Sequence, residues 1–408
     1  MSEDIKLLFL SVNEWDNRWR RKQRLAYEFS RQPDVASVLH VNPPLPNSFL
    51  DVVRGRFQPG YLGPGRHKHW QTLTGRMVAE ADGVWSYTGS SKTLPLTRLA
   101  ALRHSSPLPR INRSLYVQLI RRHLRRLPGK RLVLWMYHPL QVDLIEAFPE
   151  RALLCYDWTD DWAEFDWLPV ADRQELVAGN DCILHRADVV FAVSEELFRR
   201  ARAVNPNSYR APNATDIAVL GDNATDAVAP ELTDLARPII GYIGQIGDKI
   251  DYAMLEQVTA ARPNWSFVLV GNVWVSKRTI VDALAAQPNV YLMGQRAYAE
   301  LGGFTRGFDV CILPHLRSSL TRSMDPIKLY DYLASGKPIV STSVAGTERF
   351  ADVVYIGDTA EEFVMALEQA LAEDGALTDL RLAYARRNTW PRRADEMWQI
   401  VQQHLSRR

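Results

Sequence analysis

The stretch RPIIGYIGQIGDKIDYAMLEQVTAA (237–261) decides the predicted fold. An apolar run leads into a glycine-rich turn, and a helical pattern follows at once. Further apolar runs stand at WSFVLVG (265–271), NVYLMG (289–294), FDVCILPH (308–315), KPIVSTS (337–343) and VVYIG (353–357). Short apolar runs that alternate with helical segments are typical of parallel sheets.

The first half of the chain has the same rhythm. Strands are predicted at KLLFLSV (6–12), RLVLWMY (131–137), RALLCYD (151–157) and DVVFAVS (188–194). A polar stretch up to Leu235 then breaks the pattern and is predicted as a linker. We therefore predict an α/β fold of two tandem Rossmann-like domains, residues 1–215 and 236–388, followed by an amphipathic helix in residues 389–408. Ligands of such sheets bind at the carboxyl ends of the strands, so the site is expected in the inter-domain cleft.

The composition indicates a soluble cytoplasmic protein. Of 408 residues, 46% are hydrophobic and 24% are charged. No apolar run reaches the about 18 residues of a membrane span. The N-terminal MSEDIKLLFLSV is predicted as a first strand rather than a signal peptide. Cys155, Cys182 and Cys311 are scattered without a CxxC pair, which suits a reducing cytosol.

The turn GYIGQIGDK (241–249) is a weak candidate for anion binding. Its GxxGxxG spacing matches neither a nicotinamide fingerprint nor a P-loop. Glycines at a helix N-terminus allow backbone N–H groups to approach a phosphate. A tight turn without any ligand explains the same residues.

The segment SMDPIKLYDYLASGKPIVS (323–341) is a sharper signal. Asp325 is predicted as the N-cap of a helix and Pro326 as its first residue. Lys328 then lies in the first turn, where a cation opposes the helix dipole, and Asp331 shares its face. A bound diphosphate and ribose would account for this pair, and so would a surface Lys–Asp contact.

At this point the sequence resembles the glycosyltransferases of the GT-B fold. The resemblance covers most of residues 185–345 in the family's order. It is carried by ADVVFAVSEEL (187–197), APNATD (211–216), GYIG (241–244), NVYLMGQRAYAELGGFTRGFDVCILP (289–314) and PIKLYDYLASGKPIVST (326–342). The resemblance implies a nucleoside-diphosphate-sugar donor in the second domain and a saccharide acceptor in the first. It also implies no metal, no further cofactor and a C-terminal helix that crosses back to the first domain.

Carried over by position, the resemblance also implies donor-binding residues. Asp331 matches the family's acidic residue on the ribose. Gly244 and Gln245 match the turn beside the diphosphate, and Gly294 and Arg296 stand where the chain borders the base. Ser323 and Lys328 complete the predicted donor-binding set.

Two departures bear on the mechanism. Retaining members have a glutamate where this chain has Ser323 and an arginine where it has Gln245. Lys328 offers a replacement positive charge, as in a smaller group that includes inverting bacterial exopolysaccharide glucuronosyltransferases. The resemblance therefore favours an inverting, metal-independent transfer.

The acidic stretch CYDWTDDWAEFDW (155–167) directly follows a predicted first-domain strand. An inverting transfer needs a general base on the acceptor side. Asp157 is our choice because it ends the strand, and Asp160, Asp161 and His138 are further catalytic or acceptor-binding candidates. A solvated acidic loop is the main alternative, and a metal site is the least favoured.

The stretch INRSLYVQLIRRHLRRLPGKR (111–131) predicts a basic amphipathic helix. Leu115, Leu119, Leu124 and Leu127 form its apolar face. Such a helix is typical of peripheral contact with an anionic membrane surface, where a lipid-linked acceptor would lie. A solvated helix face is the alternative, and nucleic acid is disfavoured.

Two other functions stay open on this fold. One is a nucleotide-sugar 2-epimerase, which needs no acceptor surface. The other is a non-catalytic nucleotide-sugar-binding subunit, because the glutamate and arginine of the retaining members are absent.

Overall fold

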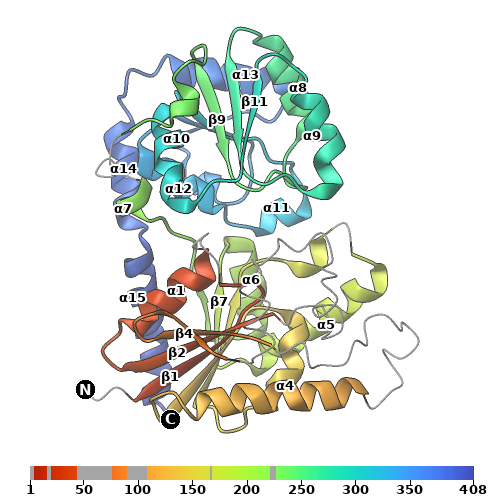
Figure 1. The fold of residues 1–408 in the computed structure, drawn as a ribbon, viewed down its shortest axis with the longest axis vertical. Helices are drawn as coiled ribbons and strands as arrows, with labels where there is room; N and C mark the ends of the chain where they lie inside the picture. Colours follow the sequence, from red (N-terminus) through yellow and green to blue (C-terminus); the bar gives the residue numbers. More distant parts are fainter. Residues whose placement is uncertain (1–3, 16–19, 44–75, 90–107, 166–167, 221–226) are drawn as a thin grey trace.

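The chain folds into two α/β domains, one above the other, in a computed structural model (Figure 1). The structure describes residues 4–15, 20–43, 76–89, 108–165, 168–220 and 227–408. Each domain is built on a sheet of mainly parallel strands between helices, as predicted. The α/β class and the two Rossmann-like units are therefore confirmed.

The first sheet has the strand order β3-β4-β2-β1-β5-β6-β7-β8. All its pairs are parallel except β3 with β4. The strands are β1 (Ile5–Leu10), β2 (Val35–Asn42), β3 (Val78–Ala81), β4 (Val84–Thr88), β5 (Arg131–Met136), β6 (Leu153–Trp158), β7 (Val189–Ala192) and β8 (Ser208–Arg210).

The second sheet is parallel throughout, in the order β11-β10-β9-β12-β13-β14. Its strands are β9 (Ile239–Ile243), β10 (Ser266–Val270), β11 (Val290–Gly294), β12 (Val310–Leu313), β13 (Ile339–Ser341) and β14 (Val354–Ile356).

Helices cover both faces of each sheet. The first domain has α1 (Arg21–Ser30), α4 (Leu108–Leu124), α5 (Val170–Arg186) and α6 (Glu195–Val204). The second has α8 (Tyr252–Ala261), α9 (Arg278–Leu284), α10 (Leu301–Gly307), α11 (Ser319–Ser323), α12 (Ile327–Ser335), α13 (Ala360–Leu371) and α14 (Thr378–Arg387), while α7 (Ile217–Leu220) follows the linker. The last helix is α15 (Trp390–Ser406).

Burial on both faces explains why the strands are continuous apolar runs. Along β1, Leu7 and Phe9 join one core cluster, which includes side chains of α1 and α15. Leu8 and Leu10 join a second cluster on the other face, which includes side chains of α4, α5 and α6. A parallel sheet covered on both sides has no polar face, so successive residues are all apolar.

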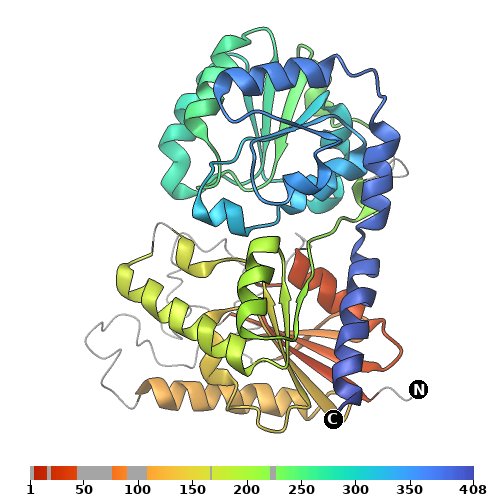
Figure 2. The same ribbon diagram turned by 180° about the vertical axis from the view of Figure 1, so that it is seen from behind.

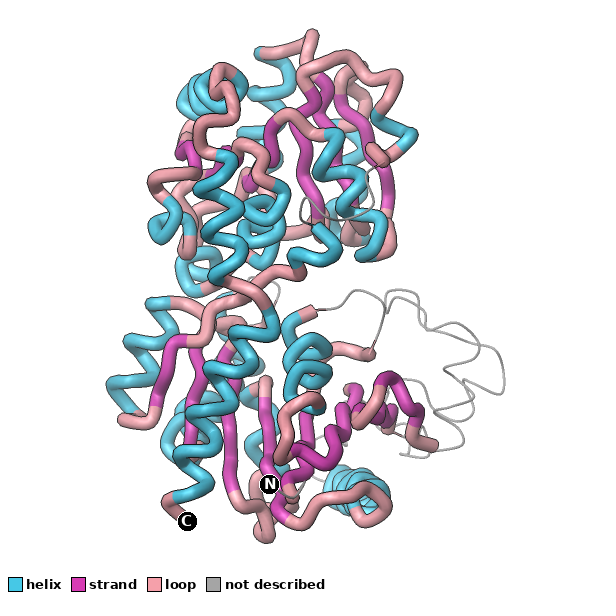
Figure 3. The backbone as a smooth tube through the Cα atoms, turned by 90° about the vertical axis from the view of Figure 1, so that its left-hand side faces the viewer, coloured by secondary structure: helices cyan, strands magenta, loops and turns pink. Residues whose placement is uncertain are grey.

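The helix α15 extends from the second domain along the first (Figures 2 and 3). Its Trp398 donates a hydrogen bond from Nε1 to Asp34 Oδ1 at 2.8 Å. At its start, Thr215 pairs with Thr389 in a β-bridge, so the two chain segments that pass between the domains lie side by side.

The basic segment forms α4 and then a turn, and its apolar side is not free. Leu124 and Leu127 are buried against the first sheet together with Val117 and Ile120. Leu115, predicted on the same face, is 44% exposed. The predicted apolar face was therefore partly wrong, because the stripe that packs on the sheet passes through Val117 and Ile120. Figure 1 shows α4 at the end of the first domain away from the second.

Within the described ranges, none of the helices combines the length and the apolar character needed to cross a membrane.

Candidate functional site

Turns that contain glycine follow strands of the second domain at their carboxyl ends, and other atoms lie very close to these glycines. Gly244 follows β9 with φ of +140°, a conformation that side chains rarely adopt. A Cβ atom at Gly244 would lie 1.9 Å from Lys328 Cε, and one at Gly271 would lie 1.8 Å from the Gly244 carbonyl oxygen. Glycine is required here because the lysine lies directly on the turn.

Lys328 and Asp331 both point into this region from α12. Burial lowers the pKa of Lys328 to about 8, and Asp331 partly offsets this effect. Burial raises the pKa of Asp331 to about 7, against the opposing hydrogen bond that Thr215 Oγ1 donates to Asp331 Oδ1 at 2.9 Å. The pKa values of both groups are therefore shifted toward neutral pH, and such shifts are typical of candidate functional sites.

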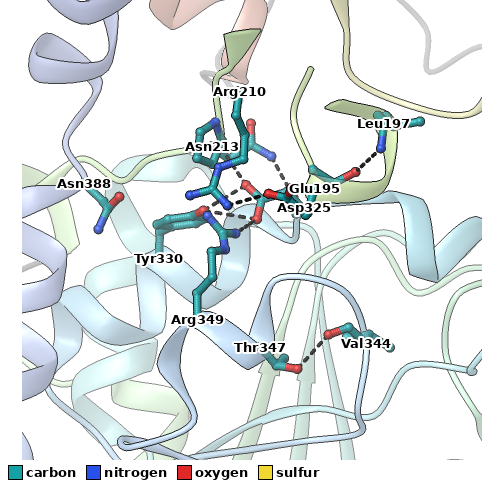
Figure 4. A network of polar contacts seen from close by, with 12 residues as sticks. Glu195, Leu197, Arg210, Asn213, Asp325, Tyr330, Val344, Thr347, Arg349 and Asn388 are labelled. Carbon is teal, nitrogen blue, oxygen red and sulfur yellow. Dashed lines mark hydrogen bonds and ion pairs between the residues drawn. The ribbon is translucent and has the colours of Figure 1, made fainter. Parts of the chain in front are cut away.

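The start of α12 differs from its prediction. The helix begins at Ile327 with Pro326 as N-cap, so Asp325 does not cap it. The Asp325 carboxylate accepts hydrogen bonds from the Asn213 backbone N–H at 2.6 Å and from Tyr330 Oη at 2.9 Å (Figure 4). It also forms an ion pair with Arg349. Because these partners bind its oxygens, the Asp325 carboxylate does not cap the N-terminus of α12.

The other predicted donor residues are more scattered. Gln245 has an exposed side chain, and Gly294 has open space around its Cα. Arg296 is bound to Glu231 at 2.7 Å. Ser323 is buried and donates a hydrogen bond from Oγ to the Leu320 carbonyl at 2.9 Å, so its hydroxyl points back into its own helix.

Lys249 is a site residue that sequence reasoning missed. It ends the glycine turn of the second domain, and its Nζ lies 3.9 Å from Asp160 Oδ1 of the first domain. Burial lowers its pKa, nearby Asp160 raises it, and Lys328 lowers it further. The letters DK at the end of GYIGQIGDK were the only signal that could have indicated it.

Asp157 lies at the end of β6, but its carboxylate is already bound. It is 0% exposed, and Arg21 donates to both of its oxygens, from Nε at 3.0 Å and from Nη2 at 2.8 Å. Such a bidentate buried pair leaves no open route for a substrate hydroxyl. The geometry therefore does not support our choice of Asp157 as the general base.

The other carboxylates of the acidic stretch differ in access. Asp161 forms an ion pair with Arg200 and is nearly buried. Asp160 keeps 27% of its side chain exposed and faces Lys249. Burial lowers the pKa of Lys22 to about 8, and the nearby Asp160 partly offsets this effect. Residues 166–167 of the stretch lie outside the described residues.

His138 is held as a neutral ring. Its Nδ1 accepts a hydrogen bond from the Leu140 N–H at 3.1 Å, and the ring lies 4.5 Å from the Trp162 ring. Burial lowers its pKa to about 4, helped by Lys22. Because Nδ1 accepts, the proton is on Nε2, and the ring is a donor rather than a base.

Two cavities flank the acidic stretch. A cavity of 790 Å³ lies within the first domain and is lined by His138, Trp162 and Tyr116 among others. A second cavity of 830 Å³ is lined by both domains, with Asp161, Glu164 and Glu195 from the first and Ser319, Arg322 and Ser343 from the second. The described residues contain no group of three or more His, Cys, Asp or Glu side chains able to hold a metal ion.

Residues 237–373 match the model of the family described as glycosyl transferases group 1. The chain is 25% identical over 281 residues to TuaH of Bacillus subtilis (strain 168), which is assigned to teichuronic acid biosynthesis as a glycosyltransferase. That alignment covers 64% of this chain and 70% of TuaH.

Solved structures show the same fold over the whole chain. Sucrose-phosphate synthase from Thermosynechococcus elongatus has a TM-score of 0.69 at 13% identity, with 100% of both chains covered. Anabaena HepE, in complex with UDP and glucose, has a TM-score of 0.62 at 14% identity, with 98% of this chain and 99% of HepE covered.

An E. coli trehalose-6-phosphate protein bound with UDP-2-fluoro glucose has a TM-score of 0.65 at 12% identity, with 98% of this chain and 99% of that chain covered. Fold and site together define a glycosyltransferase of the GT-B fold. The second domain carries the segment that matches the group 1 glycosyltransferases, and this segment starts just before β9 and contains Gly244, Lys249, Lys328 and Asp331. The family description and the function assigned to TuaH both favour this class over a 2-epimerase or a non-catalytic subunit.

Proposed function

We propose that the protein transfers a sugar from a UDP-sugar to a polysaccharide or lipid-linked saccharide acceptor. The observation that carries this proposal is the contact between Lys328 and the Gly244 turn, with Asp331 one turn along the same helix. A cation beside a glycine turn, which suits a diphosphate, and an acid, which suits ribose hydroxyls, are what a nucleotide-sugar requires. The UDP ligands of HepE and of the E. coli protein support UDP, and the assignment of TuaH to teichuronic acid biosynthesis supports a polymer acceptor.

We propose an inverting, metal-independent reaction with no cofactor besides the donor. The acceptor hydroxyl attacks the anomeric carbon while the bond from that carbon to the diphosphate oxygen breaks. The hydroxyl proton passes to a carboxylate, and the leaving diphosphate takes the bonding electron pair. Lys328 and Lys249 lie where they would stabilise the leaving charge, which is the task a metal ion performs in other sites.

Among the acidic candidates, Asp160 is the best supported general base. Asp157 is bound on both oxygens by Arg21, and Asp161 is paired with Arg200. Asp160 is partly exposed and lies at the junction with the donor domain, 3.9 Å from Lys249. A base must lie within hydrogen-bond reach of the proton that it removes, and access is therefore the first requirement.

The test is Asp160→Asn, with UDP release and sugar transfer both measured. We expect the rate to fall by about 10²–10⁴-fold with donor affinity nearly unchanged, because only proton transfer is lost. Asp157→Asn is the informative control, since it should cost about 3–5 kcal/mol of stability by leaving Arg21 without its buried counter-charge.

Near-wild-type turnover in Asp160→Asn would contradict the assignment of the base. A product that retains the anomeric configuration of the donor, seen by NMR, would contradict inversion itself. Added EDTA should leave transfer unchanged, and a loss on chelation would contradict the metal-free reaction.

We also propose that the protein works in the cytoplasm and is peripheral on the inner face of the membrane. Arg122, Arg125 and Arg126 are exposed along and just after α4, which supports electrostatic attraction to anionic lipid. The leucine side of α4 packs on the first domain, so we propose attraction by charge without insertion.

A further inference from the structure

A buried chain of polar contacts joins the acceptor-side strand β6 to the donor-side helix α12. It begins with Asp157, which is paired with Arg21 of α1. The same guanidinium donates from Nη1 to the Pro212 carbonyl at 3.2 Å and to Asn213 Oδ1 at 3.4 Å. Arg21 thus links the strand to residues 211–216, which pass from the first domain toward the second and are called the linker below.

The linker then holds the residue that precedes α12. The Asn213 backbone N–H donates to Asp325 Oδ2 at 2.6 Å, and Asn213 Nδ2 donates to the Asp325 carbonyl at 2.6 Å (Figure 4). Two residues further on, Thr215 donates to Asp331 at 2.9 Å. Asn213 and Thr215 of the linker therefore contact Asp325, just before α12, and Asp331 within it. These two contacts lie on either side of Lys328 in the sequence.

Charges alternate along this network of contacts, and three of the four are buried, while the Arg349 side chain is 21% exposed. Asp157 and Asp325 are negative, Arg21 and Arg349 are positive, and the Asp325 side chain is 0% exposed. A buried charge is tolerated when it is paired and hydrogen-bonded, so removal of one member leaves another uncompensated. This network of polar contacts is therefore favourable in one arrangement, in which each of its charged side chains is paired.

We propose that Asp325 is a positioning residue for sugar transfer. Through Asn213 and Arg21 it fixes the start of α12 relative to the end of β6. Lys328 and Asp331 are carried by α12, while Asp160 follows β6, so this link sets the distance between donor and base. The inference rests on the proposed donor-binding role of Lys328 and Asp331.

Asp325→Asn tests this inference because it keeps the shape and removes the charge. Spin labels at Val177→Cys on α5 and Ile280→Cys on α9, in a Cys182→Ser background, report the inter-domain distance; both valine and isoleucine are exposed. We expect a broader distance distribution and a loss of transfer of about 10²-fold, since a small misplacement of reacting groups is costly. The donor dissociation constant should stay within about twofold, because Asp325 does not contact the donor.

A second readout separates positioning from simple loss of folded protein. The ratio of donor hydrolysis to transfer does not depend on how much enzyme is folded, and it should rise when the acceptor is misplaced. Asp282→Asn is the matched control, since Asp282 is an exposed second-domain aspartate with one weak partner, Arg278 at 3.8 Å. It should change neither quantity.

An unchanged distance distribution together with an unchanged hydrolysis ratio in Asp325→Asn would overturn the inference. Loss of donor binding would overturn it as well, because Asp325 would then belong to the donor site. Should Asp325→Asn fail to fold, Asn213→Ala removes the side-chain link and is judged by the same readouts. If Lys328→Ala leaves donor affinity intact, the proposed donor site fails, while the distance measurement still decides the role of Asp325.

Discussion

Replacement of Lys328 by methionine gives the most direct test of the donor site. Methionine is one atom shorter than lysine but keeps an unbranched apolar stem against Gly244 and near the Tyr242 ring, whose centroid is 5.1 Å from Nζ. The main loss is the charge. The matched control is Lys337→Met, just beyond the other end of α12.

The magnitude follows from one charge-assisted contact to the diphosphate. Such a contact is worth roughly 1.5–3 kcal/mol. At about 1.4 kcal/mol per tenfold change, the dissociation constant for UDP should rise by about 10–150-fold. Titration calorimetry with UDP measures this change, and Lys337→Met should bind UDP as the wild type does.

The pH dependence of UDP binding provides an independent test of the role of Lys328. The pKa of Lys328 is about 8 in the free protein, and a bound diphosphate must raise it. Affinity is therefore fully present below pH 8 and falls as pH rises through that value, by about tenfold between pH 7 and pH 9. Asp331 and Lys249 lie near Lys328, and the charges of Lys328 and Lys249 act on the buried His315, whose pKa burial lowers. The diagnostic is therefore the difference between wild type and Lys328→Met.

Two outcomes would refute the reasoning about Lys328. One is UDP affinity in Lys328→Met within about twofold of wild type, since a direct contact to the diphosphate would cost more. The other is an unaltered fall in affinity between pH 7 and pH 9 in the variant, which would assign the titration to another group.

Two further predictions concern other parts of the molecule. Asp331→Asn should weaken UDP binding and abolish its rise between about pH 6 and pH 7.5, because burial raises the pKa of Asp331 to about 7 and ribose hydroxyls need the ionised form; calorimetry across that range decides it. Arg122→Glu, Arg125→Glu and Arg126→Glu together should abolish sedimentation with anionic vesicles at low salt, and equal sedimentation of wild type and variant would contradict the membrane proposal.

The sequence predicted the parts of the fold that depend on local pattern. Strands such as β1, β5 and β9 are buried on both faces, and their continuous apolar runs are visible in any window of the chain. The strand β2 (VASVLHVN) was missed because Ser37, His40 and Asn42 interrupt its apolar run. The antiparallel edge pair of β3 and β4 was missed for a similar reason, since short edge strands carry little pattern.

The arrangement of the candidate site was predictable where its residues are close in sequence. Lys328 and Asp331 are three positions apart on one helix, and their common face follows from the helical period. The role of Asp325 was not predictable in this way. An acid before Pro326 has the pattern of an N-cap, and its partners Asn213 and Arg349 come from distant parts of the chain.

The acidic stretch shows most clearly that partners from distant parts of the chain cannot be predicted from local sequence. Asp157, Asp160 and Asp161 lie within five residues, and the sequence favoured Asp157 as the base only because it ends a predicted strand. The fold separates them by supplying Arg21 to the first and Arg200 to the third, from helices that are distant in sequence. A carboxylate with a buried guanidinium partner holds structure, because protonation would cost that ion pair. Asp160 instead has weaker partners, Thr159 Oγ1 at 3.2 Å and Lys249 Nζ at 3.9 Å, and 27% of its side chain is exposed, which is why we propose it as the base.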